Sequence, residues 1–90
     1  MAKIIFFGTP EFALPILRKI NSSKHEILVV YTQSPKKSLR GQRFNKTVIH
    51  QYSEKISLNV KTPENLEDEE SFLKTLKFDL GIVVAYGKLI

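Results

Sequence analysis

A dense group of basic side chains lies between residues 36 and 46. Lysine and arginine take five of these eleven positions, and no acidic residue separates them. They are Lys36, Lys37, Arg40, Arg43 and Lys46. Cations at this density suit a phosphate backbone, because each phosphate that they neutralise releases bound counterions. Phe44, which lies among them, could stack on a base or anchor the segment. The composition fits phosphate contact and a solvated loop equally well.

The turn Gly8-Thr9-Pro10-Glu11 follows an apolar run, where nucleotide-binding proteins hold a pyrophosphate. Such a turn needs the pattern Gly-x-Gly-x-x-Gly, which lets the phosphates approach the backbone. Here only Gly8 is present, and Glu11 would place a carboxylate near the phosphate position. The pattern therefore favours a tight strand-to-helix turn over a dinucleotide site. In this interpretation Thr9 caps the helix and Glu11 interacts with the helix dipole.

Residue types that commonly perform catalysis or bind metals are scarce. The chain has no cysteine, which excludes disulfides, thiolate metal sites and a cysteine nucleophile. Its two histidines, His25 and His50, form no metal-binding pattern, and we interpret both as structural. No acid–base pair with a matched third group is evident, so the sequence assigns no catalytic residue and no metal site. Tyr86-Gly87-Lys88 is a better site candidate than either histidine.

Strand and helix patterns alternate along the chain. Short apolar runs predict four strands, of which the last is continuously apolar and therefore expected to be buried on both faces of a parallel sheet. The predicted strands are Lys3–Phe7, Glu26–Gln33, Asn59–Lys61 and Leu80–Tyr86. Helical spacing of apolar residues follows each of the first three strands. The order β-α-β-α-β-α-β predicts an α/β fold with right-handed crossovers.

The start of each predicted helix depends on particular residues. Phe12 opens the apolar stripe of the first helix, so we expect it in the core. Pro15 lacks a backbone donor, which means that the regular helix begins near Leu14 or is kinked there. The second helix is expected to be capped by Asn45 or Thr47. The third begins in an acidic stretch that complements the positive end of its dipole.

Ligands of such folds bind where the strands end at their carboxyl termini. Four segments share that edge: Gly8–Glu11, Gln33–Lys46, Thr62–Pro63 and Tyr86–Ile90. Ninety residues permit one domain, residues 1–90. This domain stops directly after a predicted central strand, where an α/β sheet would normally continue. We therefore expect residues 1–90 to be the N-terminal part of a larger domain, with no second domain present.

Charge and hydropathy indicate where the protein works. No apolar run reaches 18 residues, and the apolar run at the N-terminus is too short for a signal peptide. We therefore expect a cytoplasmic protein without membrane contact. Positive charge is concentrated in residues 1–61, where eleven lysines and arginines outnumber three acids. This excess favours an acidic partner for the N-terminal two thirds of the chain.

Several stretches, in this order, resemble the methionyl-tRNA formyltransferase family: KIIFFGTPEFALPIL, VVYTQ, the basic RGQR, TPENL and VVAYGKLI. The match covers essentially the whole chain, and GTPEFA with AYG is its most specific pair. The resemblance implies a Rossmann-like, incomplete formyltransferase domain. It also implies transfer of a formyl group from 10-formyltetrahydrofolate to the amino group of methionyl initiator tRNA, without a metal, by a full-length enzyme that is monomeric.

The resemblance also implies roles for individual residues. The basic segment matches the family's tRNA-contacting loop, which implies tRNA binding by Lys36, Lys37, Arg40, Gly41 and Arg43. The first turn matches the substrate side, formed by Thr9, Pro10, Glu11 and Phe12, with Phe12 in the wall around the methionyl side chain. The end of the chain matches the folate side, formed by Tyr86, Gly87, Lys88, Leu89 and Ile90.

The family's catalytic asparagine, histidine and aspartate match no position in residues 1–90, so we expect this chain alone to be inactive. Two alternatives remain open: a stand-alone basic RNA-binding α/β module, and another formyltransferase of the sugar or glycinamide ribonucleotide type. A nucleotide-binding domain is disfavoured by the single glycine of the first turn. A half-domain should expose an unpaired sheet edge and self-associate, whereas an evolved module should stay monomeric.

Overall fold

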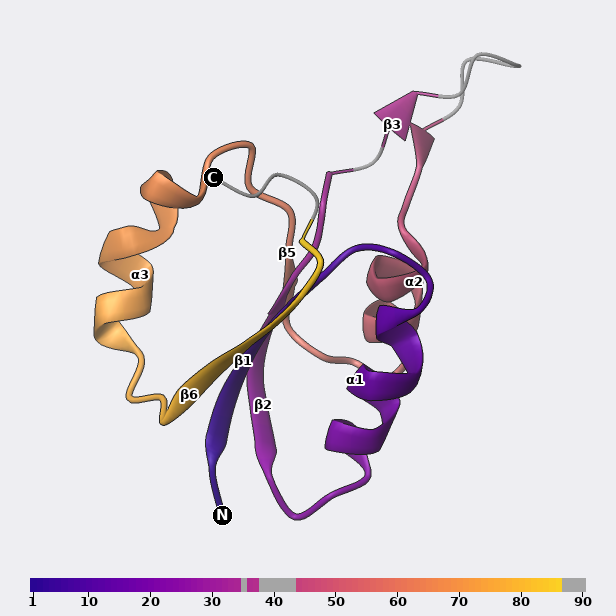
Figure 1. Ribbon diagram of the computed structural model, residues 1–90. Coiled ribbons are helices and arrows are strands. Elements are labelled where there is room, and N and C mark those ends of the chain that lie inside the picture. The colour runs from indigo at the N-terminus through magenta and orange to yellow at the C-terminus, as the bar shows by residue number, and fades with distance from the viewer. Residues whose placement is uncertain (35, 38–43, 87–90) are drawn as a thin grey trace.

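The computed structural model describes residues 1–34, 36–37 and 44–86, and only the backbone of 36–37 and 44–45. Within them, four parallel strands form one sheet in the order β5-β2-β1-β6 (Figure 1). The strands are β1 (Lys3–Gly8), β2 (Glu26–Tyr31), β5 (Val60–Lys61) and β6 (Leu80–Val84). The helices are α1 (Ala13–Asn21), α2 (Val48–Lys55) and α3 (Glu70–Thr75), the last preceded by the 3-10 turn η1 (Leu66–Glu69). The predicted α/β fold with a parallel sheet is therefore confirmed.

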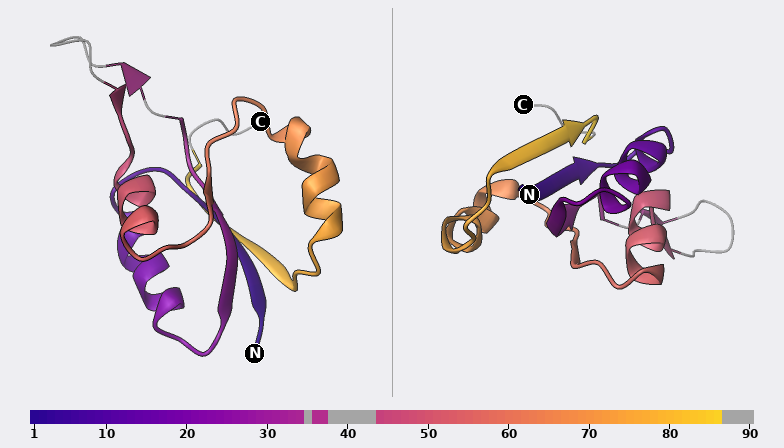
Figure 2. Two further views of the ribbon diagram at one scale, coloured as in Figure 1. Left: turned by 180° about the vertical axis from the view of Figure 1, so that it is seen from behind. Right: turned by 90° about the horizontal axis from the view of Figure 1, so that it is seen from below.

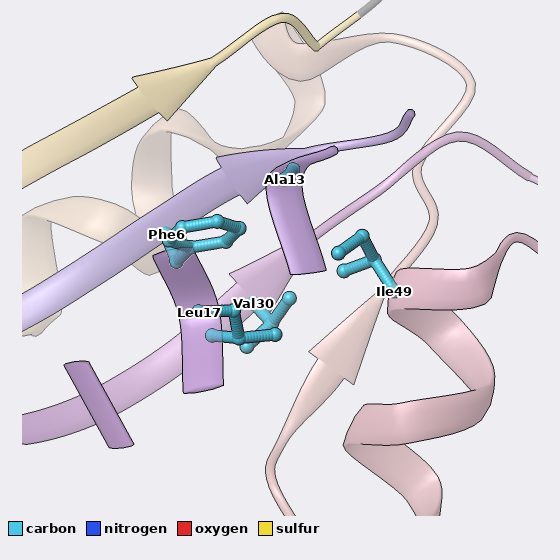
Figure 3. Packing of buried hydrophobic residues seen from close by; sticks show 5 residues of the cluster. All are labelled: Phe6, Ala13, Leu17, Val30 and Ile49. Atoms are coloured by element: carbon cyan, nitrogen blue, oxygen red, sulfur yellow. The ribbon is translucent and has the colours of Figure 1, made fainter. Parts of the chain in front are cut away.

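The helices lie on both faces of the sheet. Figures 1 and 2 show α1 and α2 on one face and α3 on the other. Side chains alternate between the faces along a strand, so the buried Phe6 and Ile5 of β1 enter different cores. The first core, between the sheet and α1 and α2, is drawn in Figure 3 and consists of Phe6, Ala13, Leu17, Val30 and Ile49. The second core, on the α3 side, contains Ile5, Val29, Tyr31 and Tyr86.

Helix α1 begins one residue earlier than predicted, and Ala13 and Leu17, rather than Phe12, form its buried side. Ala13 and Leu17 are fully buried, whereas Phe12 is 63% exposed. The expectation that Phe12 lies in the core is therefore wrong, because Phe12 precedes the helix as its N-cap residue. Pro15 is only the third helical residue, and its missing N–H costs no hydrogen bond because the first four N–H groups of a helix have no partner within it.

The N-termini of α1 and α2 differ in how they are capped. No side chain caps α1, so the prediction that Thr9 does so is wrong. Thr9 lies too far ahead of Ala13 for this role, and its hydroxyl bonds elsewhere. Helix α2 is capped by Thr47, whose hydroxyl accepts a hydrogen bond from the backbone N–H of His50 at 3.0 Å. Thr47 is one of the two caps that the sequence predicted for this helix.

Strand β6 occupies an edge of the four-stranded sheet, where it pairs with β1. The sequence predicted a strand buried on both faces, and this prediction is wrong: Leu80 is 42% and Val83 58% exposed. The chain returns from α3 and lays β6 beside β1, and none of the described residues forms a strand on its outer side. A continuous apolar run identifies the strand but not its neighbours.

Gly8, at the end of β1, lies where no side chain fits. A Cβ atom there would come within 2.7 Å of the buried Phe6 ring and 3.1 Å of Ala13 Cβ. We expect Gly8→Ala to destabilise the fold by about 1–3 kcal/mol, since overpacking a filled core forces its side chains to shift. Gly81→Ala is the matched control, because the nearest atom to its Cβ, in Phe7, is 3.5 Å away. Urea unfolding should separate the two variants, and equal midpoints would contradict this explanation.

Candidate functional site

Three strand ends are tied together at the carboxyl edge of the sheet. The Thr9 hydroxyl donates to the carbonyl of Tyr86 at 2.8 Å, and the Gln33 side-chain amide donates to the same carbonyl at 2.9 Å. The backbone N–H of Gln33 donates in turn to the Thr9 hydroxyl oxygen at 3.3 Å. The Thr9 N–H completes the set by donating to the carbonyl of Ala85, at 3.2 Å. The ends of β1, β2 and β6 therefore hold one another in place.

This edge carries a shallow hollow of about 190 Å³ beside the tied strand ends. It is lined by Gln33, Pro63, Glu64, Asn65, Leu66, Glu67 and Tyr86. Burial raises the pKa of the Tyr86 phenol, and the Glu69 carboxylate raises it further. Glu64 and Glu67 are among the lining residues, and their negative charge disfavours a phosphate there, just as the sequence of the first turn disfavours a dinucleotide.

The residues expected on the substrate and folate sides are only partly brought together. Thr9 contacts Tyr86 directly, so one residue from each side meets at the edge. Pro10 is half-buried, and Glu11 and Phe12 are exposed. Gly87, Lys88, Leu89 and Ile90 lie outside the described residues. Phe12 thus presents a large apolar side chain to solvent, three residues after Thr9 in the sequence.

The basic segment forms a hairpin at its base. Lys36 and Lys37 make up β3 and pair in antiparallel register with Asn45 and Phe44 of β4. The hairpin is a separate two-stranded ladder, and Figures 1 and 2 show it projecting beyond the four-stranded sheet. The sequence predicted an irregular loop here, because a two-residue ladder is too short to give a periodic pattern. Arg40, Gly41 and Arg43 lie outside the described residues.

Lys46, at the foot of the hairpin, has an acidic partner on α2. Its ammonium lies 2.8 Å from a Glu54 carboxylate oxygen, and His50 Nε2 lies 3.5 Å from the other oxygen. Lys46 is the main cause that lowers the pKa of the Glu54 carboxyl. Both side chains of the Lys46–Glu54 pair are 47% exposed, so the pair is worth little to stability. The Lys46–Glu54 pair places the Lys46 ammonium beside α2.

A second polar cluster joins α3 to the sheet on the opposite face. The Tyr31 hydroxyl donates to the Glu69 carboxylate at 2.9 Å, and the Lys61 ammonium lies 2.9 Å from the same oxygen. The Lys61 ammonium also lies 3.6 Å from the centre of the Phe72 ring, within range of a cation–π contact. Burial raises the pKa of the Tyr31 phenol, and Glu69 adds to this effect. Lys61 and then Tyr31 lower the pKa of the Glu69 carboxyl.

Glu69 should therefore make stability depend on acid pH. A lowered carboxyl pKa means that its stabilisation is complete above the unfolded value, about 4.3, and is lost as pH falls through the lower folded value. We expect Glu69→Gln to lower the melting temperature at pH 7, and we expect its difference from the wild type to shrink as pH falls below the unfolded value. Glu70→Gln is the control, because Glu70 pairs with Lys74 at an exposed site. A difference between wild type and Glu69→Gln that does not shrink as pH falls would contradict this explanation.

Sequence reasoning missed two of these features. It placed Gln33 at the shared edge and gave its side chain no role, although a polar residue at the end of a buried strand is a usable signal. It interpreted the acidic stretch that includes Glu69 only as complementing the helix dipole, because the partners Tyr31 and Lys61 lie far away in sequence. Among the described residues no three His, Cys, Asp or Glu side chains gather as a metal-binding group. No helix in the same part of the chain has the length and apolar character that a membrane crossing requires.

Comparison with known proteins gives a consistent set of relatives. No family model matches the chain. Curated proteins named methionyl-tRNA formyltransferase do match it over 98% of its length. That of Pelagibacter ubique is 47% identical over 91 residues, that of Rickettsia bellii 41% over 90 and that of Chelativorans 40% over 91. The chain spans 29–30% of the length of these relatives.

Proposed function

The chain belongs to the methionyl-tRNA formyltransferase family, and we propose that residues 1–90 are the N-terminal part of a catalytic domain that formylates methionyl initiator tRNA. The observation that carries this proposal is the identity of 36–47% over 98% of the chain with relatives that all bear this name. The formyl donor in the proposal is 10-formyltetrahydrofolate. The full-length protein is proposed to be a cytoplasmic monomer.

In the proposed reaction the methionyl amino group attacks the formyl carbon. The bond from this carbon to N10 of the folate then breaks, and the proton lost by the amine leaves with tetrahydrofolate. Rate acceleration requires hydrogen-bond donors at the oxyanion that forms on the formyl oxygen. The role proposed for residues 1–90 is to bind and orient the two substrates, while the acid–base groups come from other parts of the protein.

The basic hairpin is the proposed tRNA-binding element, with contacts from Lys36, Lys37, Arg40, Gly41 and Arg43. Its strands β3 and β4 project beyond the carboxyl edge of the four-stranded sheet (Figure 1). At its foot the Glu54 carboxylate is paired with Lys46. The remaining cations of the segment have no acidic neighbour in sequence, which favours contact with phosphates.

The tied strand ends are proposed to separate the substrate side from the folate side. Phe12, exposed beside them, would contact the methionyl side chain, and Pro10 and Glu11 would complete that wall. Tyr86 begins the proposed folate side, which continues through Gly87, Lys88, Leu89 and Ile90. Thr9 acts indirectly in this proposal, since its hydroxyl is occupied by Tyr86 and Gln33 and so holds the two sides in register.

A comparison of acceptors tests this function against the related formyltransferases. The full-length protein should be incubated with 10-formyltetrahydrofolate and, separately, with methionyl initiator tRNA, an amino-sugar nucleotide and glycinamide ribonucleotide. We propose that only the tRNA becomes formylated at an appreciable kcat/KM. Preferred use of either small acceptor would replace this proposal with the corresponding alternative.

A further inference from the structure

The basic hairpin is joined to the domain by two threonines that contact each other. The chain leaves the sheet after Thr32, which directly follows β2, and returns at Thr47, which directly precedes α2. The two hydroxyl oxygens lie 2.7 Å apart, within hydrogen-bonding distance. Thr32 is fully buried, so this contact is shielded from water. It closes residues 33–46 into a loop at its base.

Each threonine is also fixed to a regular element. The backbone N–H of Thr32 donates to the carbonyl of Lys61 in β5 at 3.1 Å. The Thr47 hydroxyl accepts from the backbone N–H of His50 and so caps α2. A hydroxyl has one hydrogen to donate and two lone pairs that accept, so Thr47 can hold both contacts at once. The base of the hairpin is thereby attached to the sheet on one side and to a helix on the other.

The returning strand of the hairpin is held at a further point. The Gln51 side-chain amide donates to the backbone carbonyl of Lys46 at 2.9 Å, and the Lys46 side chain pairs with Glu54. Both contacts join α2 to the residue immediately before the Thr47 cap. They hold Lys46, the first residue after β4, beside α2.

We propose that Thr32, Thr47 and Gln51 are positioning residues that fix the direction in which the basic hairpin leaves the domain. This inference rests on the proposed function, because it assigns these residues an effect on tRNA binding. A segment whose base is fixed to the domain loses less conformational freedom when it binds. Removing the contacts should therefore weaken tRNA binding while leaving every cation in place.

The Thr32→Val variant tests this, because it keeps the shape of the side chain and removes its hydroxyl. We expect its affinity for initiator tRNA to fall by about 3- to 10-fold. The slope of log affinity against log salt should stay unchanged, since that slope counts phosphates contacted rather than the cost of ordering. Thr32→Ser restores the hydroxyl and should bind as the wild type does. Wild-type affinity in Thr32→Val would overturn the inference.

A second variant, Gln51→Ala, tests the inference even if Thr32→Val does not fold. Gln51 is exposed, so its removal should leave the melting temperature unchanged. We expect its tRNA affinity to fall by about 2- to 5-fold with the same salt slope. Unchanged affinity in a folded Gln51→Ala protein would show that Gln51 is not a positioning residue.

A double-mutant cycle separates this inference from the proposed function. Thr32→Val is added to a full-length protein in which Lys36, Lys37, Arg40 and Arg43 are all alanine. If Thr32 acts by positioning the four cations, Thr32→Val should have no further effect on residual tRNA binding in this background, because these cations have been removed. An equal loss in both backgrounds would show general destabilisation and overturn the inference. Unchanged binding in the four-alanine protein itself would instead contradict the role proposed for the hairpin.

Discussion

Residues 1–90 produced alone are expected to transfer no formyl group to methionyl initiator tRNA above a control without protein. Formyl transfer needs a stabilised oxyanion and a group that takes the amine proton. At the carboxyl edge, the Thr9 hydroxyl and the Gln33 amide are occupied by bonds that tie the strands. His25 lies at the opposite end of the sheet, where its Nδ1 accepts from the N–H of Ala2. His50 is turned toward Glu54 on α2.

The assay follows label from 10-formyltetrahydrofolate into charged initiator tRNA. The Pelagibacter ubique relative, assayed at the same concentration, is the positive control for reagents and tRNA charging. A folded sample of residues 1–90 is required, which circular dichroism establishes. Turnover by this sample would refute the view that the acid–base chemistry comes from elsewhere in the protein. It would direct the search to Tyr86 and the glutamates of the hollow.

Replacing Lys36, Lys37, Arg40 and Arg43 together by alanine is expected to weaken tRNA binding by about 100- to 1,000-fold near 0.15 M salt. The estimate assumes one phosphate contact for each cation and a salt slope of about −0.9 for each contact. The same change should therefore make the salt slope shallower by roughly three to four. Filter binding of the full-length protein at several salt concentrations measures both quantities.

A matched variant distinguishes a local site from net charge. Alanine at Lys19, Lys24, Lys55 and Lys77 removes the same number of charges from exposed positions outside the hairpin. This control should lose less than about 10-fold in affinity and keep its slope, because distant surface charges are largely screened at this salt. Equal losses in the two variants would show that binding follows total charge. The hairpin would then have no particular role.

The parallel sheet could be predicted because several independent signals agreed. Apolar runs gave four strands, helical spacing gave the connections, and the parallel order follows from their alternation. The cap of α2 could be limited to two residues, of which the structure selects Thr47. Thr9 and Tyr86 could be placed at one edge, since both follow strands of that sheet. Each of these features depends either on residues close together in sequence or on the general rules for how strands and helices connect in α/β folds.

Other features depended on contacts that a single sequence does not encode locally. Whether β6 is central or at an edge depends on what pairs with its outer side, and its apolar run is compatible with either. The exposure of Phe12 depends on the residue at which α1 begins after the turn that follows Gly8. The Tyr31–Glu69 bond joins residues that are distant in sequence, and nothing near either residue indicates the other.

The proposed function places residues 1–90 in an enzyme that formylates methionyl initiator tRNA. The most direct measurement incubates the full-length protein with 10-formyltetrahydrofolate labelled in its formyl group and with methionyl initiator tRNA. The aminoacyl bond is then hydrolysed and the released amino acid is separated by chromatography. We expect label in N-formylmethionine, formed in proportion to protein and time. Label that remains entirely in the folate, while the Pelagibacter relative yields N-formylmethionine under the same conditions, would contradict it.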